Sequence, residues 1–197
     1  EVTPRAIYLR SGGALSFDAP TELQGSDQYV SDPAKPVPYT SATSFGYWRL
    51  YTAEDQRFAA SRPDVLTYRT EPLTSDLTLA GQVGVSLKVA TTGTDADFVV
   101  KLIDVYPEDT QNGPELAGVT PIAGVSLAGY NQLVKADVFR ARWRDSFAAP
   151  KPLVPNQPAS VSYQLQDVFH TFKRGHRLMV QVQSSWFPLI DRNPQTF

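Results

Sequence analysis

The 197-residue sequence contains no cysteine. This absence excludes a disulfide scaffold, a zinc site with cysteine ligands, an iron–sulfur cluster and a thiol nucleophile. Histidine is nearly as scarce, since His170 and His176 are the two histidines of the chain. Their spacing is that of neither a helical zinc pair nor a strand pair, so we expect structural histidines at a turn. We accordingly expect no metal site and no cofactor.

Charge is also low and nearly balanced. Lys and Arg number 18 and Asp and Glu number 20, which gives a net charge of −2. A nucleic-acid binder needs a basic surface, so we expect no nucleic-acid partner. No apolar run approaches the length of a membrane span, and residues 1–5 do not resemble a signal peptide, so we expect no membrane partner. Hydrophobic residues make up 42% of the chain, which favours a buried core in one domain.

Apolar residues alternate with a period of two in short segments that proline and glycine separate. In residues 81–89, Val83, Val85, Leu87 and Val89 share one face, whereas residues 98–105 are apolar on both faces. Many short strands of this kind indicate an all-β fold, a β-sandwich with jelly-roll connections. We expect one short helical turn at residues 167–172 and no long helix. Further strands are predicted at residues 6–10, 14–17, 65–70, 133–143, 161–165 and 178–183.

A long loop near the N-terminus, residues 26–62, is rich in proline and carries the aromatic residues Phe45, Tyr47, Trp48 and Tyr51. Loops of this length in compact domains are usually functional or cover something. The aromatic side chains fit two interpretations, which stay open. They line a ligand site or a domain contact, or they anchor the loop on its own sandwich.

Two groups of charged residues suggest binding or structural roles. Asp95 and Asp97 could join a calcium site, although such residues more often cap turns. Arg140, Arg142 and Arg144 would share one face of a strand. They would pair with an acidic partner or, as we favour, form a solvated sheet face.

A serine-hydrolase triad is the most tempting catalytic pattern. Residues 124–128 nearly match the G-x-S-x-G nucleophile elbow around Ser126, and Asp137, Asp145 or Asp167 precede the histidines. The elbow requires a strand, a sharp turn and a helix, and no helix pattern follows Ser126. We therefore interpret Ser126 as a serine at a turn or strand end.

Four ordered stretches together resemble the C-terminal domain of the X-Pro dipeptidyl-peptidase and cocaine-esterase-like (CocE/NonD) serine hydrolases. Within that group the chain looks most similar to α-amino-acid ester hydrolases and glutaryl-cephalosporin acylases. The stretch from Thr94 to Pro107, TDADFVVKLIDVYP, is the strongest. The others are residues 29–38, residues 55–73, and residues 175–194 with the Asp191-Arg192-Asn193-Pro194 motif.

The resemblance implies an α/β-hydrolase core, a helical cap and a C-terminal jelly roll similar to galactose-binding domains. The catalytic Ser, Asp and His of such enzymes lie in the core, so the resemblance assigns no catalytic residue here. It implies an upstream catalytic domain of the same protein as the partner, and through it a small ester or amide substrate. A homo-oligomer stays open, and an extracytoplasmic location is an expectation from relatives alone.

The resemblance also suggests that residues 1–197 are a single C-terminal domain, a fragment without the upstream core and the last strands of the sandwich. It makes residues 32–57 the expected wall of the substrate pocket. Two alternatives remain. One is a free-standing jelly roll that binds carbohydrate or another ligand through the aromatic loop, with calcium at Asp95 and Asp97. The other is a small hydrolase that uses Ser126.

Overall fold

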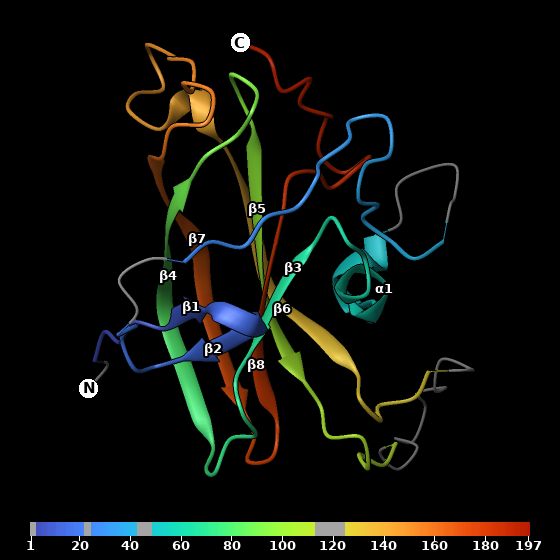
Figure 1. The fold of residues 1–197 in the computed structure, drawn as a ribbon. Helices are drawn as coiled ribbons and strands as arrows, with labels where there is room; N and C mark the ends of the chain where they lie inside the picture. Colours follow the sequence, from blue (N-terminus) through green and yellow to red (C-terminus); the bar gives the residue numbers. More distant parts are fainter. Residues whose placement is uncertain (1–2, 22–24, 43–48, 113–124) are drawn as a thin grey trace.

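The computed structural model describes residues 3–21, 25–42, 49–112 and 125–197, and its elements are mostly strands (Figure 1). The strands are β1 (Tyr8–Arg10), β2 (Ala14–Ser16), β3 (Leu66–Arg69), β4 (Leu77–Val89), β5 (Asp97–Val105), β6 (Asn131–Arg140), β7 (Ala159–Phe172) and β8 (Arg177–Gln183). The helices are the 3₁₀ turns η1 (Ser11–Gly13), η2 (Arg49–Ala53) and η3 (Ala141–Trp143) and the short helix α1 (Arg57–Ala60). No helix in these ranges is long and apolar enough to cross a membrane.

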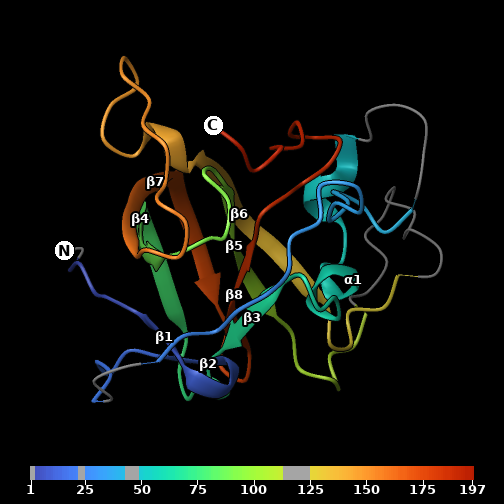
Figure 2. The same ribbon diagram turned by 45° about the horizontal axis from the view of Figure 1, so that its top comes forward.

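The strands form two sheets that face each other. One sheet has six strands in the order β1-β2-β3-β8-β5-β6, and the other is an antiparallel pair of β4 and β7. The pair lies across one face of the larger sheet (Figures 1 and 2). Apolar side chains from both sheets fill the space between them, including Leu15, Tyr68, Val100, Leu102 and Phe172. The predicted β-sandwich is therefore confirmed, while its wiring as a jelly roll stays a prediction.

The larger sheet is covered on both faces, and β5 shows this most clearly. Eight of its nine residues are buried, as the doubly apolar sequence of this strand predicts. Val100 and Leu102 point into the sandwich. Val99 and Ile103 point the other way, into a second cluster with Tyr39, Met179 and Trp186. We call this second side of the larger sheet the outer face.

The outer face is covered by irregular chain, not by a third sheet. Pro38 bridges Phe187, and the helices η2 and α1 lie on the same side of the sheet (Figures 1 and 2). The predicted long loop thus contains two short helices that its sequence pattern did not indicate. Too few residues are involved for a helical period to show.

Two predicted boundaries are wrong. The helical turn expected at residues 167–172 is the end of β7, which pairs with β4 as far as Phe172. The strand expected to reach residue 143 ends at Arg140, where η3 begins. Both predictions rest on the local sequence pattern, whereas pairing with strands distant in sequence decides where these strands end.

Candidate functional site

Two buried carboxylates, Asp95 and Asp97, lie where β5 begins, and arginines from the end of β6 bind them. Arg142 donates to Asp95 through Nε over 2.7 Å and through its backbone N–H over 3.0 Å. Arg140 donates to both oxygens of Asp97 through Nε (2.8 Å) and Nη2 (2.9 Å), and this contact raises the pKa of the guanidinium. Charge-assisted pairs of this geometry are strong, and here they neutralise carboxylates that water does not reach.

The C-terminal segment completes this group. Asn193 Nδ2 donates to Asp95 Oδ2 over 2.9 Å and to Asp97 Oδ1 over 2.8 Å. The carbonyl oxygen of Gln195 accepts from the backbone N–H groups of Thr94 and Asp95. We call Asp95, Asp97, Arg140, Arg142 and Asn193 the carboxylate centre. It fastens the C-terminal segment to the ends of β5 and β6.

The C-terminal segment passes very close to the backbone of Gly93. A Cβ atom at Gly93 would lie 2.4 Å from the carbonyl oxygen of Gln195, a backbone atom that cannot rotate away. We expect Gly93→Ala to displace the segment and lower the free energy of unfolding by about 1–3 kcal/mol in urea denaturation. Gly84→Ala on β4 is the control, because a Cβ there meets nothing within 4 Å. Equal effects of the two substitutions would contradict this account.

The carboxylate centre bears on two interpretations from the sequence. All four oxygens of Asp95 and Asp97 accept hydrogen bonds from N–H donors of Arg140, Arg142 or Asn193. In the described ranges no group of three or more His, Asp or Glu residues could hold a metal ion. Asp95 does bond a backbone N–H, but that group belongs to η3 and not to its own turn. We therefore propose no calcium site.

The prediction of a solvated arginine face was wrong. Because η3 begins at Ala141, Arg142 and Arg144 leave the period of β6. Arg140 and Arg142 turn toward buried carboxylates. The guanidinium of Arg144 donates to the carbonyl oxygens of Ala141, Lys151 and Pro152, which fixes the loop before β7.

Of the aromatic residues on the N-terminal segment, Tyr51 lies in η2, half-buried against the outer face. Its ring centre is 5.7 Å from that of Tyr39 and 5.7 Å from that of Trp186, the latter in an edge-on arrangement. Tyr51 thus anchors the segment on its own sandwich. Phe45, Tyr47 and Trp48 lie outside the described residues.

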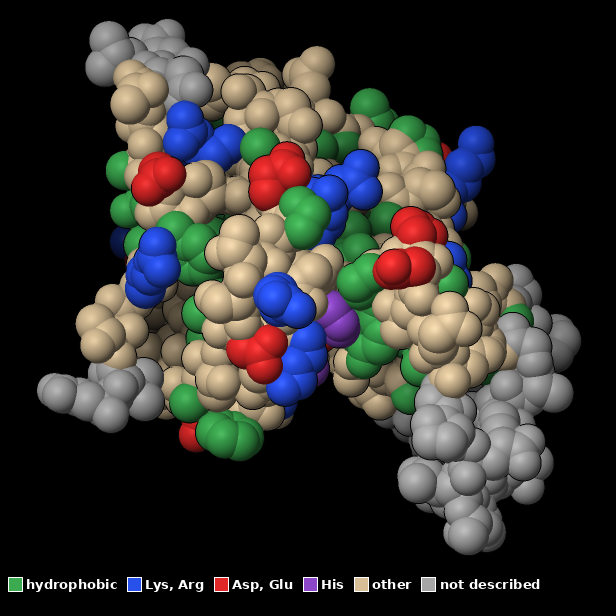
Figure 3. Space-filling view, turned by 90° about the horizontal axis from the view of Figure 1, so that it is seen from below, with side chains coloured by type: hydrophobic (Ala, Val, Ile, Leu, Met, Phe, Trp, Pro, Cys, Tyr) green, Lys and Arg blue, Asp and Glu red, His purple; other side chains and the backbone are tan. Residues whose placement is uncertain are grey.

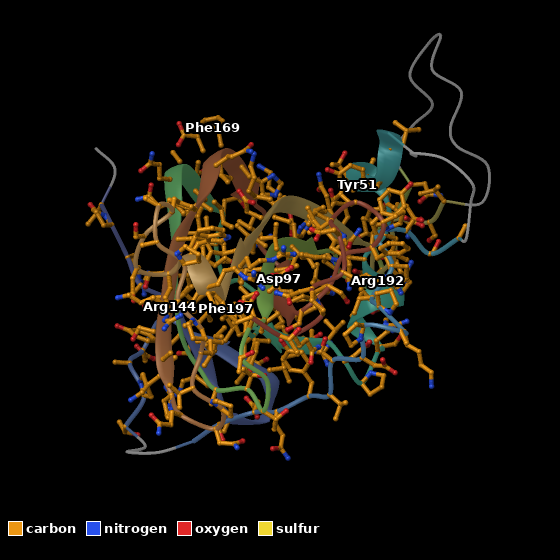
Figure 4. All side chains as sticks on the ribbon, turned by 90° about the horizontal axis from the view of Figure 1, so that it is seen from above. Tyr51, Asp97, Arg144, Phe169, Arg192 and Phe197 are labelled. Atoms are coloured by element: carbon orange, nitrogen blue, oxygen red, sulfur yellow. The ribbon has the colours of Figure 1, made fainter. Side chains whose placement is uncertain are left out.

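The segments that cover the outer face also present apolar side chains to solvent. Leu50 is 55% exposed and Phe187 38%. Figure 4 shows Tyr51 and Arg192 on the same side of the molecule, whereas Phe169 of β7 lies on another side. The guanidinium of Arg192 lies 5.1 Å from the ring centre of Phe187. This side therefore offers apolar and cationic groups to a partner surface.

A buried lysine beneath these segments was missed by the sequence analysis. Lys101 projects from β5 toward the outer face with an exposed fraction of zero. Its Nζ donates to Gln56 Oε1 over 3.0 Å and lies 5.2 Å from the ring centre of Trp186. Burial lowers the pKa of Lys101 to about 7, and the charge of Glu54 opposes this shift. The available signal was a lysine at the centre of a strand, DFVVKLIDV, that carries apolar residues on both faces.

The residues considered for a triad do not assemble as the elbow pattern would require. His170 Nε2 and His176 Nδ1 both contact Asp104, over 2.9 and 2.8 Å. The hydroxyl of Ser126 accepts from the backbone N–H of Ala128, as expected of a serine in a turn. Figure 3 shows histidine at the floor of a hollow on the face seen from below. The pair ties β5 to β7 and to the turn before β8.

Comparison with known proteins identifies the family. Residues 1–196 match the family described as the X-Pro dipeptidyl-peptidase C-terminal non-catalytic domain. The chain belongs to this family. The resemblance drawn from four sequence stretches is thereby confirmed.

Relatives of this C-terminal domain include hydrolases of known structure. The chain is 33% identical over 191 residues to the cocaine esterase of Rhodococcus sp. (strain MB1 Bresler), covering 97% of the chain and 30% of the esterase. Two solved structures match with a TM-score of 0.85 and 47% identity, covering 97% of the chain and 30% of each neighbour. They are an aminopeptidase from the marine sediment archaeon Thaumarchaeota archaeon and an α-amino acid ester hydrolase.

The coverage of these relatives is asymmetric. Each match covers 97% of this chain. It covers 30% of the length of the cocaine esterase, the aminopeptidase and the ester hydrolase. The matched part is the non-catalytic one by the family's own description. The carboxylate centre and the buried Lys101 thus belong to a non-catalytic domain.

Proposed function

We propose that this domain serves a serine hydrolase that cleaves esters, amides or X-Pro peptides, and that it packs on the catalytic domain of the same protein. The observation that carries the proposal is the family match over residues 1–196, in a chain that spans 30% of the length of its hydrolytic relatives. Acyl transfer through a serine ester, with an oxyanion hole, would be the chemistry of the catalytic domain. A free-standing carbohydrate-binding module has no comparable support.

We place the contact with the catalytic domain on the segments that cover the outer face. These segments carry the exposed apolar side chains Leu50 and Phe187. Interfaces between domains are built around apolar anchors with a polar rim, and Arg192 beside Phe187 supplies such a rim. The rings of Tyr39, Tyr51 and Trp186 pack against one another beneath this surface and hold the covering segments in place.

We further propose that residues 45–51 help to wall the substrate pocket of the parent enzyme. The support is the position of Tyr51, which holds one end of this aromatic stretch against the outer face. Aromatic side chains supply large contact areas in ligand pockets and at interfaces. Phe45, Tyr47 and Trp48 are the residues that we propose contact substrate or the catalytic domain.

The kinetics of a Trp48→Ala variant of the full-length enzyme test this wall. We expect kcat/KM to fall about tenfold, mainly through KM, since losing a contact worth about 1.4 kcal/mol changes an equilibrium constant tenfold. An amino-acid p-nitrophenyl ester and an X-Pro p-nitroanilide serve as substrates. Phe169→Ala is the control, because Phe169 is 86% exposed on β7, away from Tyr51 (Figure 4). Unchanged KM and kcat in the Trp48 variant would overturn the pocket role.

We also propose that residues 1–197 form one C-terminal domain of a longer protein, with an α/β-hydrolase core before it and further strands that complete its smaller sheet. The 30% coverage of the relatives supports the first part. For the second part, β4 and β7 pair only with each other among the described strands, and unpaired strand edges are a liability. The intact mass of the natural protein tests this, since a mass near that of residues 1–197 alone contradicts it.

A further inference from the structure

Lys101 is enclosed by groups from three parts of the chain. In the larger sheet it pairs with Ala136 of β6 and Gln181 of β8. The side chain of Gln56, just before α1, accepts the hydrogen bond from Nζ. The rings of Trp186 and Phe58 lie 5.2 and 5.9 Å from Nζ. The amine is thus the point where the segment around α1, the C-terminal segment and the sheet meet.

The hydrogen bonds of Gln56 connect the amine to the backbone of the covering segment. Gln56 is fully buried, its Nε2 donates to the carbonyl oxygen of Glu54, and its backbone N–H donates to Asn131 of β6 over 3.0 Å. Gln181 Nε2 approaches the carbonyl oxygen of Gln56 at 3.4 Å. Through its hydrogen bond to Gln56, Lys101 therefore fixes the stretch between η2 and α1 on the sheet.

Among the residues that the structure describes, no charged group forms an ion pair with Lys101. Asp55 pairs with Arg57 at the surface, and the sheet neighbours Ala136 and Gln181 are uncharged. Glu54 is the carboxylate whose charge acts on Lys101. Its Oε1 accepts from the backbone N–H and the hydroxyl of Ser41.

Several buried polar atoms near the amine lack partners. Glu54 Oε2, Gln181 Oε1 and Trp186 Nε1 have no hydrogen-bond partner in the described part of the chain. A buried polar network that is incompletely satisfied is costly, and an ammonium ion adds a larger desolvation cost. The desolvation cost of the charged amine falls when the covering segment lifts and water reaches Lys101, which is fully buried in the closed arrangement.

We propose that Lys101 is a positioning residue whose amine, when it gains a proton, loosens residues 49–60 from the outer face of the sheet. Loss of the proton restores the closed arrangement through the Lys101–Gln56 contact. The proton comes from solvent when the segment opens, and no covalent bond changes. The consequence for catalysis rests on the proposed function, since residues 49–60 continue from the aromatic stretch that we place at the substrate pocket.

The direction of the pH dependence follows from the closed and open states. In the closed state burial lowers the pKa of Lys101 to about 7, from an ordinary value of 10.5 that the solvated amine regains on opening. Opening therefore takes up a proton between these two values, and the opening constant rises about tenfold for each pH unit lost from pH 9 toward pH 7. Below pH 7 both states are protonated, so the rise stops.

Amide hydrogen exchange in the full-length protein tests whether Lys101 anchors residues 49–60 on the outer face. This test of the anchor needs no assay of catalysis. The backbone N–H groups of Gln56, Ala59 and Ala60 are hydrogen-bonded in the closed segment and serve as probes. After correction for the intrinsic exchange rate, we expect these amides to open about 50-fold more often at pH 7 than at pH 9. Lys101→Met removes the titrating group and should abolish this difference. Lys88→Met, an exposed lysine on β4, should preserve it.

A second variant keeps the test decisive if Lys101→Met does not fold. Glu54→Gln removes the charge that raises the pKa of Lys101, so the tenfold rise should continue below pH 7. Corrected exchange that does not change with pH in the unaltered protein overturns the anchor. So does an equal pH dependence in the Lys101→Met variant.

The pH profile of kcat/KM separates this inference from the proposed function. Suppose that amide exchange responds to Lys101 and that the ratio of kcat/KM between Lys101→Met and the unaltered enzyme changes near pH 7. Then the role of Lys101 and the pocket role of the segment are both supported. If exchange responds and the two profiles are parallel, the anchor stands and the pocket role of the segment is overturned. If exchange does not respond, the anchor is overturned whatever Trp48→Ala does to KM.

Discussion

Replacing Asp95 with alanine is expected to lower the free energy of unfolding by about 3–5 kcal/mol. Asp95 has an exposed fraction of zero and accepts bonds from Arg142 Nε, the Arg142 backbone N–H and Asn193 Nδ2. The substitution leaves these donors without an acceptor and the Arg142 guanidinium without its counterion. Breaking one partner of a buried pair costs more than the pair itself contributes, because the remaining charge stays poorly solvated.

Urea unfolding of the purified protein measures this loss. Asp145→Ala is the matched control, because Asp145 pairs with Lys151 over 3.2 Å but the two side chains are 48% and 62% exposed. Exposed pairs of this kind contribute about 0–1 kcal/mol. A loss below about 1 kcal/mol in the Asp95 variant would mean that the carboxylate centre does not hold the domain together.

The strands were predictable where packing repeats along the sequence. β4 and β7 alternate because one face lies on the core, and β5 carries apolar residues on both faces because the sheet is covered on both sides. The ends were less predictable. Nothing local in residues 139–143 shows that the chain turns into η3, because this turn depends on Asp95, which is 47 residues away from Arg142.

The candidate sites show the same limit. Asp95 and Asp97 were recognised as unusual, but their partner Asn193 is 98 and 96 residues distant, so no spacing rule could supply it. The Asp191-Arg192-Asn193-Pro194 motif was noticed through the family resemblance and not through its chemistry. The prediction of a strand apolar on both faces assigned no role to its lysine, Lys101. Here the opposite face is covered by residues distant in sequence, among them Gln56 and Trp186.

The carboxylate centre and Lys101 handle buried charge in different ways, and this difference has a consequence for stability. Asp95 and Asp97 are each neutralised by an arginine in contact, so their charge is stabilised where it lies. Lys101 has Gln56 and two aromatic rings beside it, and no carboxylate of the described ranges is in contact with it. Its charge is therefore a cost to the folded state that solvent pH can remove.

We expect the stability of the unaltered protein to rise with pH above neutrality and that of Lys101→Met to lack this contribution. The folded-state pKa of Lys101 is about 7 and the ordinary value is 10.5, so the unfolded chain binds more protons between these values. Stability then increases by about 1.4 kcal/mol per pH unit, or about 3 kcal/mol from pH 7 to pH 9.5. The cost of the buried charge is fully present below pH 7.

Urea unfolding of both proteins at pH 7 and pH 9.5 measures this contribution as a difference between two differences, in which other titrating groups cancel. The range stops at pH 9.5 because burial raises the pKa of Tyr68 and Tyr163, and these phenols withdraw stability as pH rises past 10. Met retains most of the apolar volume of the lysine side chain, so Lys101→Met should also be the more stable protein at pH 7. Parallel pH dependences would show that Lys101 is solvated or paired in the folded protein, and the enclosure described for it would be wrong.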